Sequence, residues 1–518
     1  MTDTVPAVLA QQAGSRSAHP MLICDSDRIG YADAARSSAS LARGLVALGV
    51  GKGTHVGVLF PNGTSFVVAM LAAARIGAVV VPFTTFGTTP ELLQQLRHSD
   101  VRILLTARSY RDHQYDLRLA EALGQDEFGS GTALMSPAAP QLRHVVFDLA
   151  ELAALAGNVD ENLLPALESD VGEEDPLAVI YTSGSTAAPK GAIHTHGTLI
   201  GHQRNLNGIR GLSPDDILFC NSPFFWVGGF AFALLATLVA GGTLLCSNAT
   251  DAGQTLELLE AERPTVTNGF AATVARLTEH PSFARRDLSS MRRGNLYPIM
   301  AADARPADSE LRHNMLGLTE TGGTVLLSSD ETDQPEFRRG SFGRPAPGFE
   351  VKVARADGEP VLAGDSGDLC FRGRYLMQRY HRCSREESFD ADGWLSTGDV
   401  VCADLDGFLY FLGRGTAMIK SAGANVSPAE VENAISRVTG GLTAHVLGLA
   451  DQMRGQIVVA VLALRDGQRF DEHAARAGLA AELSAYKIPR RFAVVPEADV
   501  ALLSSGKVDR RRLHEHFA

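Results

Sequence analysis

Short apolar runs alternate with helix-like segments along residues 20–150, and this alternation limits the folds open to the chain. The expected strands are 56–60, 79–83 and 101–105, and the expected helices are 65–77 and 92–98. The first run ends at Pro61-Asn62-Gly63, which is typical of a turn. Because continuous apolar strands need both faces covered, the pattern predicts an α/β fold of parallel-type sheets covered by helices.

The chain has 518 residues, too many for one ordinary core, so we expect at least two domains. Strand-like runs become frequent past residue 340, which predicts a β-rich subdomain at about 340–413 within an N-terminal domain of residues 1–413. The segment 414–518 then shows a helix (428–437), strands (443–448 and 457–464) and a second helix (471–485). It has the size of a small α+β domain, and we place a hinge at 413–417.

The formal charge of −12, from 47 basic and 59 acidic residues, argues against nucleic-acid binding and against an anionic membrane surface. The six cysteines form no metal-binding spacing and are typical of reduced thiols in a cytoplasmic protein. We find no signal peptide at the N-terminus. Val227–Cys246 has no charge over twenty residues, but its four glycines favour a buried helix and strand over a membrane span.

The segment Tyr181–Gly191, YTSGSTAAPKG, follows the apolar run Leu177–Ile180. Glycine and hydroxyl residues let main-chain N–H and side-chain O–H groups surround a polyphosphate, and Lys190 adds a positive charge. The pattern does not match a Walker loop. It predicts a phosphate loop after a strand, with a plain polar linker as the alternative.

Further motifs follow in an order that resembles the adenylate-forming superfamily of acyl- and aryl-CoA synthetases, peptide-synthetase adenylation domains and luciferases. The pattern is most similar to acyl-CoA ligases and extends from about residue 30 to residue 513. The motifs after the phosphate loop are Leu318–Thr321, Gly340–Gly348, Trp394–Asp399, Gly413-Arg414, Ser421–Glu432 and Ser505–Asp509. The resemblance implies a large N-terminal domain and a small mobile C-terminal lid domain.

The resemblance assigns ATP and Mg²⁺ to these motifs. It implies that Glu320 holds Mg²⁺, that Thr319 contacts the AMP phosphate and that Asp399, at the end of a tight turn, accepts the ribose hydroxyls. Lys507 would stabilise charge during adenylation. The implied nucleotide and cofactor contacts are Thr182, Ser183, Gly184, Ser185, Thr186, Lys190, Thr319, Asp399, Arg414 and Gly423. The implied catalytic residues are Lys507, Glu320, Thr319 and Lys190.

The second half-reaction implies CoA as a further substrate. Rotation of the lid would replace Lys507 with the loop Ser421–Asn425, where Gly423 permits close approach of the pantetheine arm. The implied acid pocket includes Trp226, Gly228, Leu316 and Gly317. Trp226 stands where many acyl-CoA synthetases have histidine, and a core aromatic is an equal alternative.

Four positions depart from the family pattern. Met300–Pro306 stands in place of the usual Gly-Gly-Ala-Pro turn, and the interval to Glu320 is short, so a helix beside the acid pocket is expected to be trimmed. Leu316 stands where the family usually has a tyrosine. At the hinge, Thr416 stands in place of an Asp or Lys, and Arg379 replaces the Gly of a Gly-Tyr pair. These changes affect adenine packing and acid identity, whereas the charged residues remain.

The leading hypothesis is an ATP-dependent carboxylic acid–CoA ligase. One alternative keeps the adenylation and changes the acceptor to a carrier-protein thiol or an amine, including activation of nitrite for diazotisation of an aryl amine. A further alternative is a non-catalytic nucleotide-binding paralogue. The acid stays open, and so does the oligomeric state, for which a homodimer is one possibility.

Overall fold

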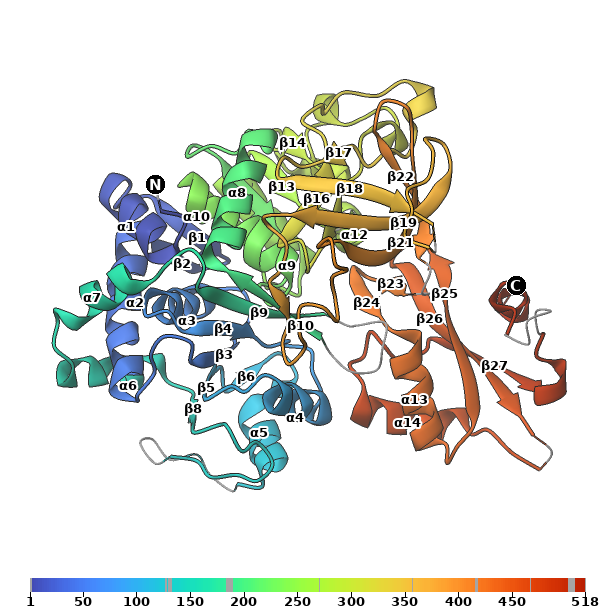
Figure 1. The fold of residues 1–518 in the computed structure, drawn as a ribbon, viewed down its shortest axis with the longest axis horizontal. Helices are drawn as coiled ribbons and strands as arrows, with labels where there is room; N and C mark the ends of the chain where they lie inside the picture. The colour runs from blue at the N-terminus through green and yellow to red at the C-terminus, as the bar shows by residue number, and fades with distance from the viewer. Residues whose placement is uncertain are drawn as a thin grey trace.

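Figure 1 shows the fold in a computed structural model. The structure describes residues 2–125, 128, 133–182, 190–269, 271–355, 357–414, 418–465, 467–501 and 508–517. Two large sheets fill the N-terminal half, a four-stranded sheet follows, and a separate C-terminal domain completes the chain. The α/β fold class with a small C-terminal domain is therefore confirmed.

The first large sheet has seven strands in the order β20-β10-β9-β4-β3-β5-β8. Its strands are β3 (His55–Leu59), β4 (Val79–Pro82), β5 (Ile103–Thr106), β8 (His144–Val146), β9 (Pro176–Thr182), β10 (Lys190–Thr195) and β20 (Arg379–Tyr380). Strands β8, β5, β3, β4 and β9 run parallel, while β10 and β20 add antiparallel strands at one edge. The predicted helices correspond to α3 (Thr64–Arg75) and α4 (Thr89–His98).

The second large sheet has six strands in the order β14-β13-β11-β12-β1-β2. Its strands are β1 (Pro20–Cys24), β2 (Asp27–Gly30), β11 (Ile217–Cys220), β12 (Thr243–Cys246), β13 (Val266–Asn268) and β14 (Arg293–Gly294). The largest hydrophobic cluster joins both sheets through α2 (Tyr31–Ala47), α3 and α8 (His196–Arg210). Burial of this shared layer is the main stabilising contribution to the N-terminal domain.

The uncharged segment Val227–Cys246 lies inside this layer. It forms α9 (Val227–Gly229), the π-helix η2 (Phe230–Leu235), α10 (Ala236–Ala240) and β12, and the side chains of η2 are buried. The prediction of a buried helix and strand is confirmed. Among the described residues, every helix is too short or too polar to cross a membrane.

The β-rich region predicted past residue 340 is also present. Its antiparallel strands are β18 (Phe349–Ala354), β19 (Ser366–Gly373), β21 (Leu395–Ala403) and β22 (Leu409–Arg414). A smaller sheet of β15 (Leu316–Leu318), β16 (Gly323–Leu327) and β17 (Arg344–Pro345) precedes it. Between β14 and β15 the chain forms only short 3₁₀ turns, consistent with a trimmed segment before Glu320.

The C-terminal domain packs two helices on one sheet and appears in orange to red in Figure 1. Its elements are β23 (Ile419–Ser421), β24 (Ala424–Val426), α13 (Pro428–Val438), β25 (Thr443–Asp451), β26 (Gly455–Leu464), α14 (Glu472–Glu482) and β27 (Arg491–Pro496). Gly413 and Arg414 end strand β22, and 415–417 lie outside the described residues. The end of α14 contacts α4, where Thr88 Oγ1 donates to the Glu482 carbonyl at 3.0 Å.

The other α-helices cover the sheets and connect the strands. They are α1 (Val5–Ser15), α5 (Tyr115–Leu123), α6 (Leu149–Ala154), α7 (Leu163–Asp170), α11 (Ala252–Glu262), α12 (Ala271–Thr278) and α15 (Arg510–Leu513).

Candidate active site

The predicted phosphate loop lies between two paired strands of the seven-stranded sheet. Strands β9 and β10 pair antiparallel, with Thr182 directly opposite Lys190. The loop therefore leaves the sheet at Thr182 and returns at Lys190, and both side chains are partly exposed. The predicted contacts Ser183, Gly184, Ser185 and Thr186 lie outside the described residues.

Thr319 and Glu320 lie in a tight turn between β15 and β16, as predicted. Three buried side chains donate hydrogen bonds to main-chain oxygens of this turn and the strand after it: His194 to Thr319 (2.7 Å), Gln203 to Gly322 (3.0 Å) and His202 to Thr324 (2.9 Å). These donors come from β10 and α8, which directly follow the phosphate loop. The turn that holds Glu320 is thus fixed to the element that holds Lys190.

The two histidines under this turn are uncharged. Burial lowers the pKa of His194 and of His202 to about 4, and their hydrogen bonds to main-chain oxygens offset this only in part. A neutral imidazole has one N–H, and here it is assigned to Nε2, because a carbonyl can only accept. No role was predicted for these histidines, although the polar His194 directly after the apolar run 191–193 of strand β10 was a usable signal.

Lys190 and Glu320 meet at a third side chain, Tyr380 of β20. The Tyr380 hydroxyl donates to Glu320 Oε1 at 2.5 Å. Lys190 Nζ lies 5.2 Å from the centre of the Tyr380 ring, within the range of a cation–π contact. The structure thus joins two predicted site residues through a tyrosine to which the sequence analysis assigned no function.

Asp399 lies within strand β21, which corrects the prediction that it ends a tight turn. It pairs with Arg414 of β22, and its side chain is only 1% exposed. Gly398 has a positive φ of 72°, so the Thr-Gly-Asp pattern marks an irregularity inside the strand. The pairing with β19 shifts register here, while β22 pairs with β21 from Asp399 onward. Of Arg414, the structure describes the main chain only.

The elements that hold these residues share one hydrophobic cluster. Ala192 of β10, Leu316 of β15 and Leu395 of β21 all belong to it. This shared core packs together β10, β15 and β21, which contain Lys190, precede Glu320 and contain Asp399, respectively. It also locates Leu316, a predicted pocket residue, whose side chain is 6% exposed and packs into the core.

Trp226 lies at the start of α9 in a cluster of aromatic side chains. Its ring centre is 6.2 Å from that of Phe86 and 5.4 Å from that of Phe225. Phe86 also contacts Tyr486 of the C-terminal domain at 6.3 Å. Trp226 is partly exposed, so it lies at the rim of the core and is available to contact a bound molecule.

The remaining predicted positions are glycines and one lysine. Gly317 is exposed, and a Cβ there would stand 2.9 Å from the Gly323 carbonyl oxygen, so the close approach of β15 and β16 requires glycine. Gly228 is partly exposed. Gly423 forms the turn between β23 and β24 with φ +84°. Lys507 lies outside the described residues.

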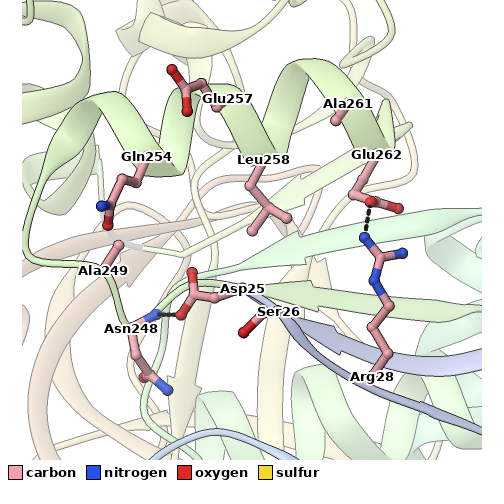
Figure 2. Close-up of a pocket in the computed structure, with 10 residues that line it drawn as sticks. All are labelled: Asp25, Ser26, Arg28, Asn248, Ala249, Gln254, Glu257, Leu258, Ala261 and Glu262. Atoms are coloured by element: carbon pink, nitrogen blue, oxygen red, sulfur yellow. Dashed lines mark hydrogen bonds and ion pairs between the residues drawn. The ribbon is translucent and has the colours of Figure 1, made fainter.

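A surface pocket of about 560 Å³ lies elsewhere, between the β1–β2 turn and α11 (Figure 2). Asp25 and Glu262, two of its lining residues, are hydrogen-bonded to Asn248 and Arg28 respectively. It contains none of the predicted site residues.

Comparison with known proteins decides the family. Residues 9–381 match the AMP-binding enzyme family, and residues 430–507 match the C-terminal domain of AMP-binding enzymes. The chain belongs to the AMP-binding enzyme family. It is an adenylate-forming ligase, and the family matches cover β9, β10, Glu320 and Tyr380 as well as most of the C-terminal domain.

Relatives of this AMP-binding enzyme extend over nearly its whole length. It is 29% identical to sulfoacetate–CoA ligase of Cupriavidus necator over 99% of this chain and 98% of that protein. It is 30% identical to feruloyl-CoA synthase of an Amycolatopsis species over 93% of each chain. Among solved structures, a fatty acyl-CoA synthetase of Mycobacterium tuberculosis is 27% identical with a TM-score of 0.68, covering 99% of this chain and 98% of that one.

Proposed function

We propose that this AMP-binding enzyme is a carboxylic acid–CoA ligase. It joins an acid to ATP to give an acyl-adenylate and pyrophosphate, and it then transfers the acyl group to the thiol of CoA. The observation that supports this most directly is the meeting of Lys190 and Glu320 at Tyr380 beside the hairpin of the phosphate loop.

In the first step, a carboxylate oxygen of the acid attacks the α-phosphorus of ATP and pyrophosphate leaves. The acid needs no general base, because carboxylic acids are ionised at neutral pH. Lys190 and the 182–190 hairpin hold the phosphates, Thr319 contacts the α-phosphate, and Asp399 accepts hydrogen bonds from the ribose. Lys507 supplies positive charge where negative charge develops.

The residues present are suited to Mg²⁺. Among the described residues, no group of three or more His, Cys, Asp or Glu side chains could hold a metal ion by itself. Mg²⁺ is usually bound by one or two carboxylates together with phosphate oxygens and water, and Glu320 offers such a carboxylate at the phosphate loop. Bound there, Mg²⁺ would neutralise phosphate charge.

In the second step, the C-terminal domain of residues 414–518 rotates as a lid about the hinge 413–417. Gly423 then lines the entry of the CoA thiol. Its φ of +84° and its position at the tip of the β23–β24 turn support close approach of a thin pantetheine chain. The thiol sulfur attacks the acyl carbon and AMP leaves.

The acceptor is CoA and not another thiol or an amine. Three relatives that are 29–30% identical over 93–99% of this chain are named as CoA ligases or synthases, which favours CoA over nitrite and amine chemistry. Their acids differ widely, from sulfoacetate to ferulate. Trp226, with Phe86 and Phe225 around it, is the side chain that we propose lines the acid pocket.

The test is incubation with ATP, Mg²⁺ and a panel of aliphatic and aryl acids, with and without CoA, followed by mass spectrometry. We expect AMP and a new acyl-CoA with one class of acid. AMP release that is independent of CoA, with nitrite and an amino-aryl acid in the panel, would contradict the choice of acceptor. The Lys507→Ala variant should lose adenylate formation but still convert a supplied acyl-adenylate to the thioester.

A further inference from the structure

Strand β20 fixes the main chain of Tyr380 beside the strand that begins with Lys190. Tyr380 stands opposite Ala192, and Arg379 opposite Ile193. Main-chain hydrogen bonds on either side extend this pairing. The Gln378 amide donates to the Ile193 carbonyl at 2.8 Å, and the His381 amide donates to the Gly191 carbonyl at 2.7 Å. The position of the Tyr380 side chain is therefore set by hydrogen bonds and not by loop packing alone.

The turn that holds Glu320 is fixed in a similar way, but only in its main chain. Its carbonyl oxygens accept from the buried side chains of β10 and α8, and the Glu320 carbonyl accepts from the Met377 amide at 2.8 Å. The freedom that remains belongs to the Glu320 side chain. A partly exposed glutamate loses rotamer freedom when it binds a ligand, unless a neighbour has already fixed it.

Tyr380 is that neighbour. Its hydroxyl donates to one carboxylate oxygen, Oε1, at 2.5 Å, which orients the carboxylate plane and leaves Oε2 available to a cation. Its ring face meets Lys190 Nζ at 5.2 Å. A cation–π contact holds the ammonium without neutralising it, whereas direct pairing of Lys190 with Glu320 would weaken both as ligands for phosphate and metal.

We infer that Tyr380 is a positioning residue for the first half-reaction: it presents the Glu320 carboxylate to Mg²⁺ and keeps Lys190 separate from it and directed at the phosphates. This inference rests on the proposed function, in which Glu320 holds the metal. In this role Tyr380 acts through Glu320 and Lys190.

The test uses two substitutions and a matched control on the full-length protein. Tyr380→Phe removes the hydroxyl and keeps the ring, and Tyr380→Leu removes both. The control is Tyr410→Phe, because the Tyr410 hydroxyl donates to Asp404 Oδ2 at 3.1 Å in a comparable tyrosine–carboxylate bond that involves neither Glu320 nor Lys190. Circular dichroism and the melting temperature establish that each variant folds.

The first readout is independent of turnover: the affinity for Mn²⁺ in the presence of α,β-methylene-ATP, measured by electron paramagnetic resonance. Partners that orient a metal ligand typically affect affinity 10- to 100-fold, so we expect Tyr380→Phe to raise the Kd for Mn²⁺ about 10-fold. The second readout is ATP–pyrophosphate exchange against Mg²⁺ concentration, which should shift to higher Mg²⁺. Tyr380→Leu should also raise the KM for ATP, and Tyr410→Phe should match the wild type.

The Glu320→Gln variant distinguishes a failure of the proposed metal site from a failure of the inference about Tyr380. If Glu320→Gln binds Mn²⁺ as the wild type does, the metal site of the proposed function is wrong. If Glu320→Gln weakens Mn²⁺ binding and Tyr380→Phe leaves both readouts at the wild-type values, the inference about Tyr380 is overturned while the proposed function stands.

Discussion

Lys487 Nζ of the C-terminal domain lies 2.6 Å from Glu91 Oε1 of α4 in the N-terminal domain. The same ammonium lies 2.7 Å from Glu430 Oε1 of α13. Burial would lower the pKa of Lys487, but Tyr486 and the two carboxylates raise it overall. For Glu91, burial raises the pKa, yet Lys487 and local hydrogen bonds lower it. Both partners are thus charged at neutral pH, and the contact holds the two domains in this arrangement.

Replacing Lys487 by Met should destabilise the protein, because the carboxylates of Glu91 and Glu430, which are only 14% and 21% exposed, would then face each other without a cation. Removing one partner of a buried ion pair typically costs about 3–5 kcal/mol. Urea unfolding measures the loss, and addition of Glu91→Gln should recover part of it in a double-mutant cycle. The control is Glu472→Gln, which breaks the exposed pair of Arg476 with Glu472 and should cost less than about 0.5 kcal/mol. Equal stability of Lys487→Met and wild type would contradict the role of the contact.

Acid should destabilise the protein between pH 6.5 and 4 through the buried histidines. Burial lowers the pKa of His194, His196 and His202 from the ordinary 6.5 to about 4. In that interval the unfolded chain binds more protons than the folded one, so stability falls as pH falls. Each histidine contributes at most about 1.4 kcal/mol per pH unit.

The measurement is the free energy of unfolding in urea at pH 7, 6 and 5. His202→Gln should reduce the slope by about one proton. A slope that His202→Gln does not alter would show that this histidine is not the group that titrates.

Trp226→Ala should raise the KM for the acid substrate and leave the KM for ATP nearly unchanged. The indole borders Phe86 and Phe225 at the rim of the core, so its loss enlarges the proposed acid pocket. Pocket contacts of this kind discriminate by about 1–3 kcal/mol, so we expect the KM for the acid to rise 10-fold or more and the KM for ATP to stay within about twofold. Trp394→Phe is the matched control, because Trp394 packs under Lys352 and Arg372 on the four-stranded sheet. An unchanged acid KM in Trp226→Ala would place the pocket elsewhere.

Asp399→Asn should weaken recognition of the ribose. The substitution keeps the shape of a residue that is 1% exposed but removes the charge that we propose accepts the two ribose hydroxyl groups. We expect the KM for ATP to rise about 10-fold and the preference for ATP over 2′-deoxy-ATP to disappear. A variant that still discriminates against 2′-deoxy-ATP would show that another group reads the 2′-hydroxyl.

Local patterns sufficed to predict the strands and helices of the large parallel sheet. Val79–Val81 and the helix that precedes it are continuous apolar segments bounded by turn residues, so neighbouring residues contain the signal. The turn that contains Glu320 could also be predicted locally, because the segment around it is rich in glycine and threonine.

The positions of Tyr380 and Asp399 depend on pairing between distant strands, which the local sequence pattern does not indicate. Strand β20 is two residues long and has no periodicity of its own, so nothing near Tyr380 indicates that it pairs with β10. Asp399 was predicted in a turn because Thr-Gly-Asp favours turns, but its pairing with Arg414 of β22 keeps it in β21. Contacts between distant segments decided both cases.

The late arrival of strand β20 has a consequence for synthesis on the ribosome. Strand β10 is complete at residue 195, but its partner at residues 379–380 emerges about 185 residues later, which at common elongation rates takes roughly 10–40 s. During that interval the outer side of β10 is an unpaired sheet edge in a nascent chain that already contains the phosphate loop. Chains truncated before residue 379 should therefore aggregate or bind chaperones more readily than chains extended beyond residue 381.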